Sequence, residues 1–249
     1  MAKPALVVSD LHLGGVPDAI SQAFIRFTRH WQGRAELMVI NGDLFDFWLE
    51  YRTAVLSQHF HVLRALADLR ESGVRLVMLG GNHDAWGGAF LSEEIGIELA
   101  DGPVELELGG RRALVAHGDG LGPGDLGYKL LKRMLRSRPA RSLMRWIHPD
   151  LADLIVRRIS KTGEQVPEQH EPSLVRSRVL REYATSLLTE RDDLDLVIFG
   201  HCHLPEVLRV GEHGYYVNSG DWVSHRTYTV IRPTGIDQAN WTDEETLLT

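Results

Sequence analysis

The 249-residue sequence predicts an α/β fold organised around a parallel sheet. Short runs that are apolar throughout are typical of strands buried on both faces. In the first half of the chain these runs alternate with longer segments whose apolar residues recur at helical spacing, which favours parallel strands joined by helices. Five such runs stand out, at 5–8, 37–40, 75–79, 113–116 and 194–199.

The segments between the first runs predict the connecting elements. Residues 19–31 and 55–70 have the apolar spacing of amphipathic helices, and a shorter helix is expected at 90–94. The segment 104–108 alternates apolar and charged residues, and a Gly-Gly pair at 109–110 joins it to the next apolar run. That arrangement predicts a hairpin, at which the sheet becomes mixed.

The second half of the chain predicts a helical insertion, at about 121–172, within a single domain of residues 1–249. Apolar residues of the insertion keep helical spacing amid Lys and Arg, and Pro139 ends one of its helices. A helix at 174–188 then returns to the β core. The polar tail after Pro233 is expected to be frayed.

The composition excludes several classes of protein. No stretch approaches the 18 or more consecutive apolar residues of a membrane span. The first residues lead directly into a strand, so we expect no signal peptide. The single cysteine excludes an internal disulfide and suits a reducing compartment. We therefore expect a cytoplasmic protein.

The net charge of −7 is unevenly distributed. Residues 125–161 contain ten Lys or Arg and three Asp or Glu, whereas the remainder contains 17 basic and 31 acidic residues. A generally basic surface for nucleic acid is therefore not expected, but one segment is strongly cationic.

Each of the five apolar runs ends in residue types that bind metal ions. Because ligands bind at the carboxyl edge of open α/β sheets, we expect these side chains to meet there. In the Asp-x-His and His-x-His pairs, an extended chain would point both side chains the same way, and Cys202 the other way into inert packing. The proposed ligands are Asp10, His12, Asp43, Asn82, His117, His201 and His203.

This mixture of carboxylate, amide and imidazole groups suits Mn²⁺, Fe²⁺ or Zn²⁺. Seven ligands are too many for one tetrahedral ion but fit two ions that share a carboxylate. Two ions about 3.5–4 Å apart are typical of enzymes that hydrolyse phosphate esters. Other histidines are expected to be ordinary surface or core residues, and the aromatic residues after Asp43 to be core and pocket wall. The histidines expected to be ordinary are His30, His59, His61, His148, His213 and His225. The aromatic residues expected in the core and the pocket wall are Phe45, Phe47 and Trp48.

The ordered motifs resemble those of the calcineurin-like metallophosphoesterases: Asp10-x-His12, Gly42-Asp43, Gly81-Asn82-His83-Asp84, His117-Gly118 and Gly200-His201-x-His203. The resemblance implies a two-sheet αββα sandwich. It assigns one metal to Asp10, His12, Asp43 and His203, and the other to Asp43, Asn82, His117 and His201. It also implies that His83, held by Asp84, contacts the phosphate or protonates the leaving group.

A closer resemblance covers nearly the whole chain. Ser9-Asp-Leu-His-Leu13, Gly42-Asp-Leu-Phe-Asp-Phe-Trp48 and His117-Gly-Asp119, together with the basic helical insertion, are similar to the UDP-2,3-diacylglucosamine diphosphatases of lipid A synthesis. That family releases UMP and an acylated sugar 1-phosphate, usually with Mn²⁺. Its best-known branch has Arg where this chain has His83, which leaves the substrate open. The implied substrate contacts are Asn82, His83, Asp125, Tyr128, Ser160, Lys161 and His201.

Other functions stay open at this point. A soluble metallophosphodiesterase acting on cyclic nucleotides or single-stranded nucleic acid would use the same ligands, and a sandwich without metals would serve as a scaffold. The complete ligand set argues against the scaffold. The apolar residues of the insertion favour an acyl-chain contact or an anionic membrane surface over internal packing alone, so we expect peripheral association with the inner membrane. No obligate protein partner is evident.

Overall fold

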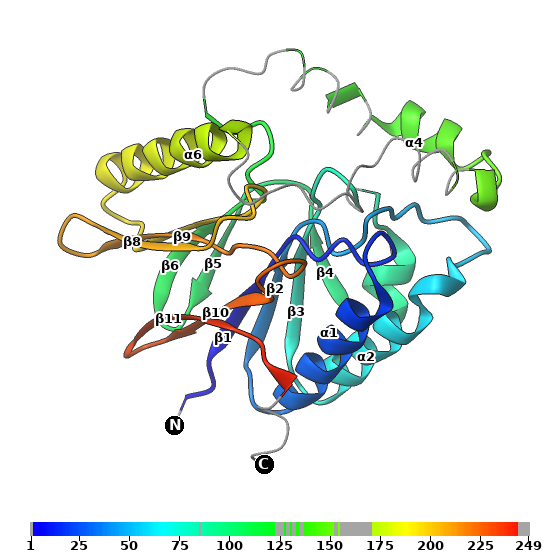
Figure 1. The fold of residues 1–249 in the computed structure, drawn as a ribbon, viewed down its shortest axis with the longest axis horizontal. Helices are drawn as coiled ribbons and strands as arrows, with labels where there is room; N and C mark the ends of the chain where they lie inside the picture. The colour runs from blue at the N-terminus through cyan, green and yellow to red at the C-terminus, as the bar shows by residue number, and fades with distance from the viewer. Residues whose placement is uncertain are drawn as a thin grey trace.

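The computed structural model describes residues 2–84, 86–122, 127, 130, 133–134, 137–151, 154 and 171–243. Two sheets lie face to face, with helices on the outer side of each (Figure 1). The first sheet has the strand order β11-β10-β1-β2-β3-β4, and the second has the order β5-β6-β7-β9-β8. The αββα sandwich implied by the motifs is therefore confirmed.

The first sheet has a parallel centre and an antiparallel edge. Strands β1 (Ala5–Val8), β2 (Leu37–Asn41), β3 (Arg75–Leu79) and β4 (Ile97–Ala100) run parallel. Val7 pairs with Val39, and Val39 with Val77, so the carboxyl ends of the three strands lie level. Strand β10 (Thr227–Arg232) pairs antiparallel with β1, and β11 (Gly235–Asn240) pairs with β10.

The second sheet contains the predicted hairpin. Strands β5 (Val104–Leu108) and β6 (Arg111–Val115) pair antiparallel around the Gly109-Gly110 turn, in which both glycines have positive φ. Strand β6 pairs in parallel with β7 (Leu196–Phe199), and β7 with β9 (Gly214–Asn218), which pairs antiparallel with β8 (Glu206–Val210). The expectation of one sheet that becomes mixed at the hairpin is wrong, because the hairpin begins a separate sheet.

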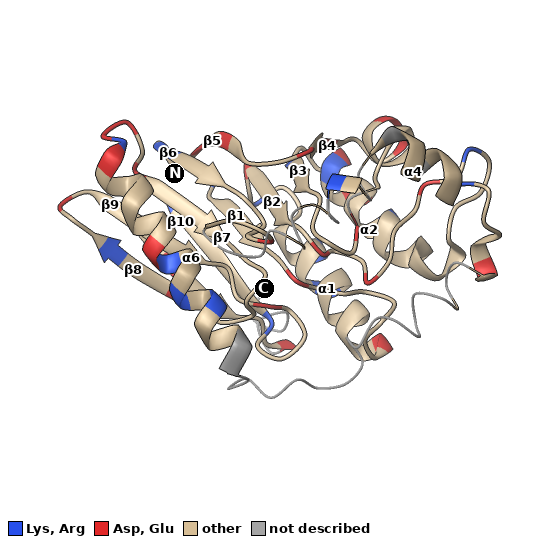
Figure 2. Ribbon diagram, turned by 90° about the horizontal axis from the view of Figure 1, so that it is seen from above, with Lys and Arg blue, Asp and Glu red and all other residues tan. Residues whose placement is uncertain are grey.

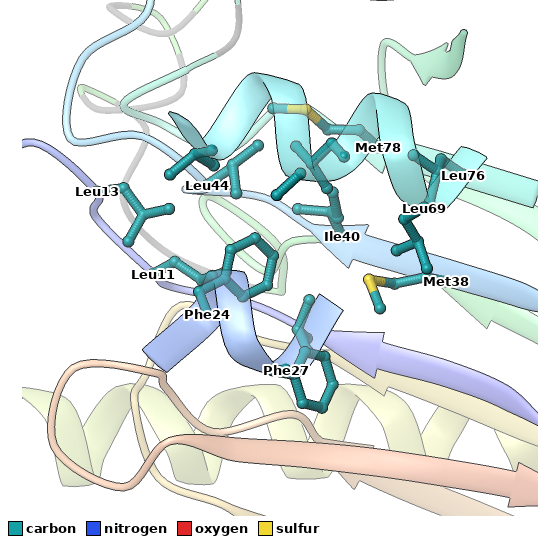
Figure 3. Close-up of a cluster of buried hydrophobic side chains, with 14 of the residues drawn as sticks. Leu11, Leu13, Phe24, Phe27, Met38, Ile40, Leu44, Leu69, Leu76 and Met78 are labelled. Carbon is teal, nitrogen blue, oxygen red and sulfur yellow. The ribbon is translucent and has the colours of Figure 1, made fainter. Parts of the chain in front are cut away.

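The full burial of β1, β2 and β7 explains why these runs of the sequence are apolar. One set of alternate residues, including Val39 and Ile198, packs between the two sheets. The other set in the first sheet packs against α1 (Asp18–Trp31) and α2 (Phe60–Glu71), as for Met38 and Phe24 in Figure 3. The second sheet packs against α6 (Glu171–Glu190), and Figure 2 shows both signs of charge on that helix.

Three predicted elements need correction. The helix expected at 55–70 is a 3₁₀ turn, Ser57–His59, followed by α2, and Val55 is exposed. The tail after Pro233 is not frayed up to residue 241, because β11 extends the sheet and Trp241 is buried in the core. Its polar residues mark an edge strand with one open face. The helix expected at 90–94 is a short π-helix.

Most of the predicted insertion lies outside the described residues, so its boundaries and the single-domain organisation stay predictions. Within it, α4 (Arg138–Met144) has Pro139 in its first turn, where the missing N–H group is tolerated. Met144 and Ile147 pack against the buried Phe47, whereas Trp146 is 87% exposed. Among the helices that the structure describes, none is long and apolar enough to cross a membrane.

Candidate metal centre

The proposed ligands follow five strands and meet where the two sheets adjoin. Those after β1, β2 and β3 come from the first sheet, and those after β6 and β7 come from the second. The seven residues lie in loops directly after the strands, as predicted. Their convergence depends on the packing of both sheets, and not on one sheet edge as the sequence suggested.

The ligand loops are not extended, and the reason given for the Asp-x-His and His-x-His pairs is therefore wrong. Left-handed φ angles occur at Asp10 (52°), His12 (48°), Asp43 (53°), His201 (68°) and His203 (57°). A non-glycine residue rarely adopts this conformation, and such residues cluster at functional sites. Hydrogen bonds between loops stabilise this backbone conformation here, because the backbone N–H groups of Leu11 and His12 both donate to the Asp43 carbonyl.

Asp10, His12 and His203 form the first ligand cluster. Nε2 of His203 lies 3.3 Å from Oδ1 of Asp10 and 3.4 Å from Nε2 of His12. The other Asp10 oxygen accepts the backbone N–H of His201 at 2.9 Å. Asp10 and His12 are buried, so the cluster presents a carboxylate and two imidazoles to one point inside the protein.

Asp43, His117, His201 and Asn82 form the second cluster. Nε2 of His117 lies 3.3 Å from Oδ2 of Asp43 and 3.3 Å from Oδ1 of Asn82. Nδ1 of His117 is 2.8 Å from the Asn41 carbonyl, which directs Nε2 towards the cluster. Oδ2 of Asp43 also lies 3.9 Å from Nε2 of the first-cluster His12, so Asp43 stands between the two clusters.

Glycines allow this close approach. A Cβ atom at Gly42 would lie 2.3 Å from Nδ1 of His117, and one at Gly81 would lie 2.0 Å from Oδ1 of Asp43. Both contacts are shorter than any van der Waals separation. The glycines of the Gly-Asp and Gly-Asn-His motifs are therefore required by the packing of the ligands.

Opposite charges strongly shift the pKa values of the buried ligands. Burial would lower the pKa of His117, but Asp43 and Asp10 raise it to about 10. In the same way, Asp10 outweighs burial and raises the pKa of His203 to about 9. His203 and His117 outweigh burial at Asp10 and lower its pKa to about 2. At Asp43, His117 and His12 outweigh burial and hold the pKa well below its usual value. Burial and the nearby His117 lower the pKa of His201 to about 4.

His83 lies beside the first cluster, and its ring stands 4.7 Å from that of His12. Its Nδ1 atom is 2.9 Å from the backbone carbonyl of Asp46 and 3.5 Å from Oδ1 of that residue. The same Oδ1 lies 3.7 Å from Nδ1 of His12. Asp46 thus links the two imidazoles, a role that the sequence reasoning missed. A second carboxylate three residues after Asp43 was the available signal.

Asp84 has a different role from the one expected. Its carboxylate accepts hydrogen bonds from the backbone N–H groups of Gly81, Asp43, Leu44 and Phe45, at 2.7–3.3 Å. These bonds join the Asp43 loop to the Asn82 loop. Burial and the charge of Asp43 raise the pKa of Asp84 to about 6. The residue that holds the His83 ring is Asp46.

The remaining predicted residues divide into two groups. Cys202 is buried among Ala116, Leu180 and Phe199, as expected, and burial raises the pKa of its thiol to about 12. Phe45, Phe47 and Trp48 are buried as well. The substrate contacts expected at Asp125, Tyr128, Ser160 and Lys161 lie outside the described residues.

Comparison with known proteins identifies the family of this site. A profile described as calcineurin-like phosphoesterase matches residues 3–205. The chain belongs to the calcineurin-like phosphoesterases. It is therefore a hydrolase of a metal-dependent family, and the structure brings together Asp and His side chains that could hold metal ions.

Relatives of this phosphoesterase share a name. Proteins named UDP-2,3-diacylglucosamine hydrolase are similar to it over most of its length. That of Porphyromonas gingivalis is 28% identical and covers 89% of this chain and 91% of its own. Those of Tolumonas auensis and Ralstonia nicotianae are 30% and 31% identical, and cover 91% and 82% of this chain and 92% and 78% of their own.

The arrangement fits the divalent metals of a calcineurin-like phosphoesterase. Oδ1 of Asp10 and Nδ1 of His12 are buried, and neither makes a hydrogen bond with the described residues. A buried carboxylate oxygen without such a partner is costly unless a cation or another donor compensates it. Oxygen and imidazole nitrogen atoms without thiolate suit ions such as Mn²⁺ or Zn²⁺.

Proposed function

We propose that this phosphoesterase hydrolyses the pyrophosphate bond of UDP-2,3-diacylglucosamine, giving UMP and 2,3-diacylglucosamine 1-phosphate. The observation that carries the proposal is the similarity to hydrolases named for this substrate, at 28–31% identity over most of the chain. The two ligand clusters support the reaction class, because cleavage of a phosphoanhydride needs charge neutralisation at the phosphoryl oxygens.

The donor set is suited to two ions, of which Mn²⁺ is our first choice and Fe²⁺ or Zn²⁺ the alternatives. Asp10, His12, Asp43 and His203 would hold one ion, and Asp43, Asn82, His117 and His201 the other. When bound, two such ions activate a water molecule and neutralise charge on the phosphoryl group. Asp43 is placed to serve both, since it stands between the clusters.

His83 supplies a proton donor next to the ligands. Its Nδ1 atom faces the Asp46 carbonyl, which accepts the N–H of that atom, and Nε2 is then the atom left to act on substrate. A protonated Nε2 would donate to a phosphoryl oxygen or to the leaving oxygen as negative charge develops there. Asp46 orients the His83 ring. Asp84 does not contact that ring and acts indirectly, because its carboxylate holds the backbone of the Asp43 loop.

The insertion at about 121–172 is proposed to select the substrate. Its described part docks on the sandwich through Met144 and Ile147 but leaves Leu143 and Trp146 exposed, at 69% and 87%. Exposed apolar groups in a cationic segment suit acyl chains and an anionic membrane surface, which supports our proposal of a cytoplasmic protein that associates peripherally with the inner membrane. Asp125, Tyr128, Ser160 and Lys161 remain proposed contacts of this segment.

A substrate panel tests the proposal. The protein loaded with Mn²⁺ is offered UDP-2,3-diacylglucosamine, UDP-N-acetylglucosamine, a cyclic nucleotide and a small chromogenic phosphodiester, and kcat/KM is measured for each. We expect the diacylated substrate to exceed the others by at least about 100-fold, or about 2.7 kcal/mol. A preference for the cyclic nucleotide or the chromogenic diester would instead support a soluble metallophosphodiesterase.

A further inference from the structure

Asp221 and His225 form a carboxylate–imidazole pair that is not among the proposed ligands. Asp221 is fully buried, and its Oδ2 binds Nδ1 of His225. Its Oδ1 accepts the backbone N–H groups of Ser224 and His225, and its own carbonyl accepts the N–H of Thr227. In the sequence, nothing distinguishes His225 from the histidines expected to be ordinary surface or core residues.

The loop that contains this pair is packed against both loops of the first ligand cluster. On one side, Oγ of Ser9 bonds Oγ of Ser219 at 2.7 Å, and the Trp222 N–H donates to the Asp10 carbonyl at 3.2 Å. On the other side, a Cβ atom at Gly220 would lie 2.9 Å from Cβ of Pro205, two residues after His203. Asp221 is thus placed between the Asp10 loop and the His203 loop.

The negative charge of Asp221 is held next to the first cluster. Asp221 is buried, and the residue that follows it, Trp222, donates its backbone N–H to the carbonyl of Asp10. A loop of this kind could be capped equally well by an asparagine, whose oxygen also accepts two backbone N–H groups. Burying a charged carboxylate costs much more free energy than burying a neutral amide. We therefore infer that the charge of Asp221 has a role other than closing the turn.

We propose that Asp221 is a positioning residue of the metal centre, which strengthens cation binding at the cluster of Asp10, His12 and His203 without itself being a ligand. His225 holds its Oδ2 oxygen, and the Ser9 and Trp222 contacts tie its loop to the ligands. Outer partners of metal ligands commonly change metal affinity by about 10–100-fold. The inference does not depend on which phosphoester is hydrolysed.

The test measures metal retention in the complete, Mn²⁺-loaded protein. Loaded protein is exposed to increasing concentrations of a chelator, and the manganese retained per chain is determined by atomic emission. We expect the wild-type protein to lose its ions in two steps. In Asp221→Asn, one of the two ions should be lost at a free chelator concentration about 10–100-fold lower than in the wild type. The concentration at which the other ion is lost should change less than about threefold.

Two variants control for charge and for loop structure. Asp237→Asn removes the same unit of charge from an exposed position on β11, where the carboxylate pairs with Arg232, and should leave both steps unchanged. His225→Gln keeps a donor for Asp221 together with its negative charge, and should stay within about threefold of the wild type at both steps.

The thermal midpoint of the metal-stripped Asp221→Asn protein separates the proposed role from a structural one. It should match that of the stripped wild type, because asparagine keeps an acceptor oxygen for the backbone N–H groups of Ser224 and His225. Unchanged retention of both ions in Asp221→Asn would overturn the proposal. So would an equal weakening of both steps together with a lower thermal midpoint, which would make Asp221 a structural residue. Neither result bears on the proposed substrate, because the experiment contains no substrate.

Discussion

The Nδ1 atom of His83 lies 2.9 Å from the backbone carbonyl oxygen of Asp46, and this contact fixes which ring nitrogen remains for chemistry. A carbonyl accepts hydrogen bonds only, so Nδ1 must carry the proton and Nε2 is the atom directed elsewhere. The same residue, Asp46, also places its carboxylate 3.5 Å from that nitrogen.

Removal of the His83 ring should slow turnover without removing the metals. General acid–base catalysis contributes about 10²–10⁴-fold, and we expect His83→Ala to lower kcat within that range. Manganese per chain should stay at the wild-type value, because His83 is not one of the proposed ligands. An undiminished kcat would show that the reaction proceeds without this imidazole. Loss of metal would show that it acts as a ligand.

The Asp46→Asn variant should have a smaller effect than His83→Ala. The carbonyl of residue 46 remains in place, so the orientation of the ring is kept and only the carboxylate is lost. We expect kcat to fall about tenfold, equivalent to about 1.4 kcal/mol in the barrier. A Cβ atom at Gly15 would lie 2.4 Å from Cγ of Asp46, so Gly15→Ala should displace Asp46 and give a similar loss. A wild-type kcat in both variants would contradict this role.

Asp43→Ala should remove both metals. Asp43 lies 3.3 Å from Nε2 of His117 and 3.9 Å from Nε2 of His12, between the two clusters. We expect less than about a tenth of the wild-type metal content and a loss of nearly all activity. The comparison variant is His203→Ala, which belongs to one cluster and should retain about one ion. Two ions bound to an active Asp43→Ala protein would exclude a shared carboxylate.

Metal binding should release protons and strengthen with rising pH. In the metal-free protein the pKa of His117 is raised to about 10 and that of His203 to about 9, so both rings carry a proton at neutral pH. A ring must lose that proton to bind a metal. The affinity for Mn²⁺ should therefore increase between about pH 7 and 9 and decrease in acid. Calorimetry at pH 7.5 in buffers of different ionisation enthalpy should report release of about two protons. His117→Ala and His203→Ala should each release one fewer, and binding heats that do not depend on the buffer would refute the prediction.

The exposed apolar residues Leu143, in α4, and Trp146, just after it, should matter only for the acylated substrate. Leu143 and Trp146 contact little of the described protein, so Leu143→Ser/Trp146→Ser should fold normally. Each methylene withdrawn from water contributes about 0.8 kcal/mol, so we expect KM for UDP-2,3-diacylglucosamine to rise at least about tenfold. Hydrolysis of a small chromogenic phosphodiester should stay within about twofold. Met144→Ser is the matched control, because that side chain packs on the sandwich and its loss should weaken docking of α4 instead. Equal losses on both substrates would place these residues outside substrate selection.

The sequence predicted where the proposed ligands lie, directly after buried strands, better than it predicted the geometry that brings them together. Apolar runs identified strands buried on both faces, and each ligand follows such a run, so the position after the strand was sufficient to find Asp10 or His117. The division of the strands between two sheets was not visible in the pattern, because a buried strand reads the same in either sheet. Only the family resemblance implied the sandwich.

The contacts of the site could not be predicted for a similar reason. Asp46 acts through a backbone carbonyl as well as a carboxylate, and a backbone group leaves no mark in the sequence. The pairing of Asp84 with four amide groups depends on loop conformations with left-handed φ, which the assumption of extended chain excluded. Strand β11 was missed because an edge strand with one open face has the composition of a polar tail.

Five ligand residues, Asp10, His12, Asp43, His201 and His203, share the left-handed backbone that glycine adopts most readily. Holding a side chain in that conformation costs about 1–3 kcal/mol at each position. Substitution of one of these residues by glycine would therefore remove the strain energy of the backbone at that position, but it would also remove a proposed metal ligand. Thermal stability alone cannot preserve these residues over generations, and only selection for turnover can, so a lineage that no longer needed the reaction would lose its ligands quickly and keep its fold.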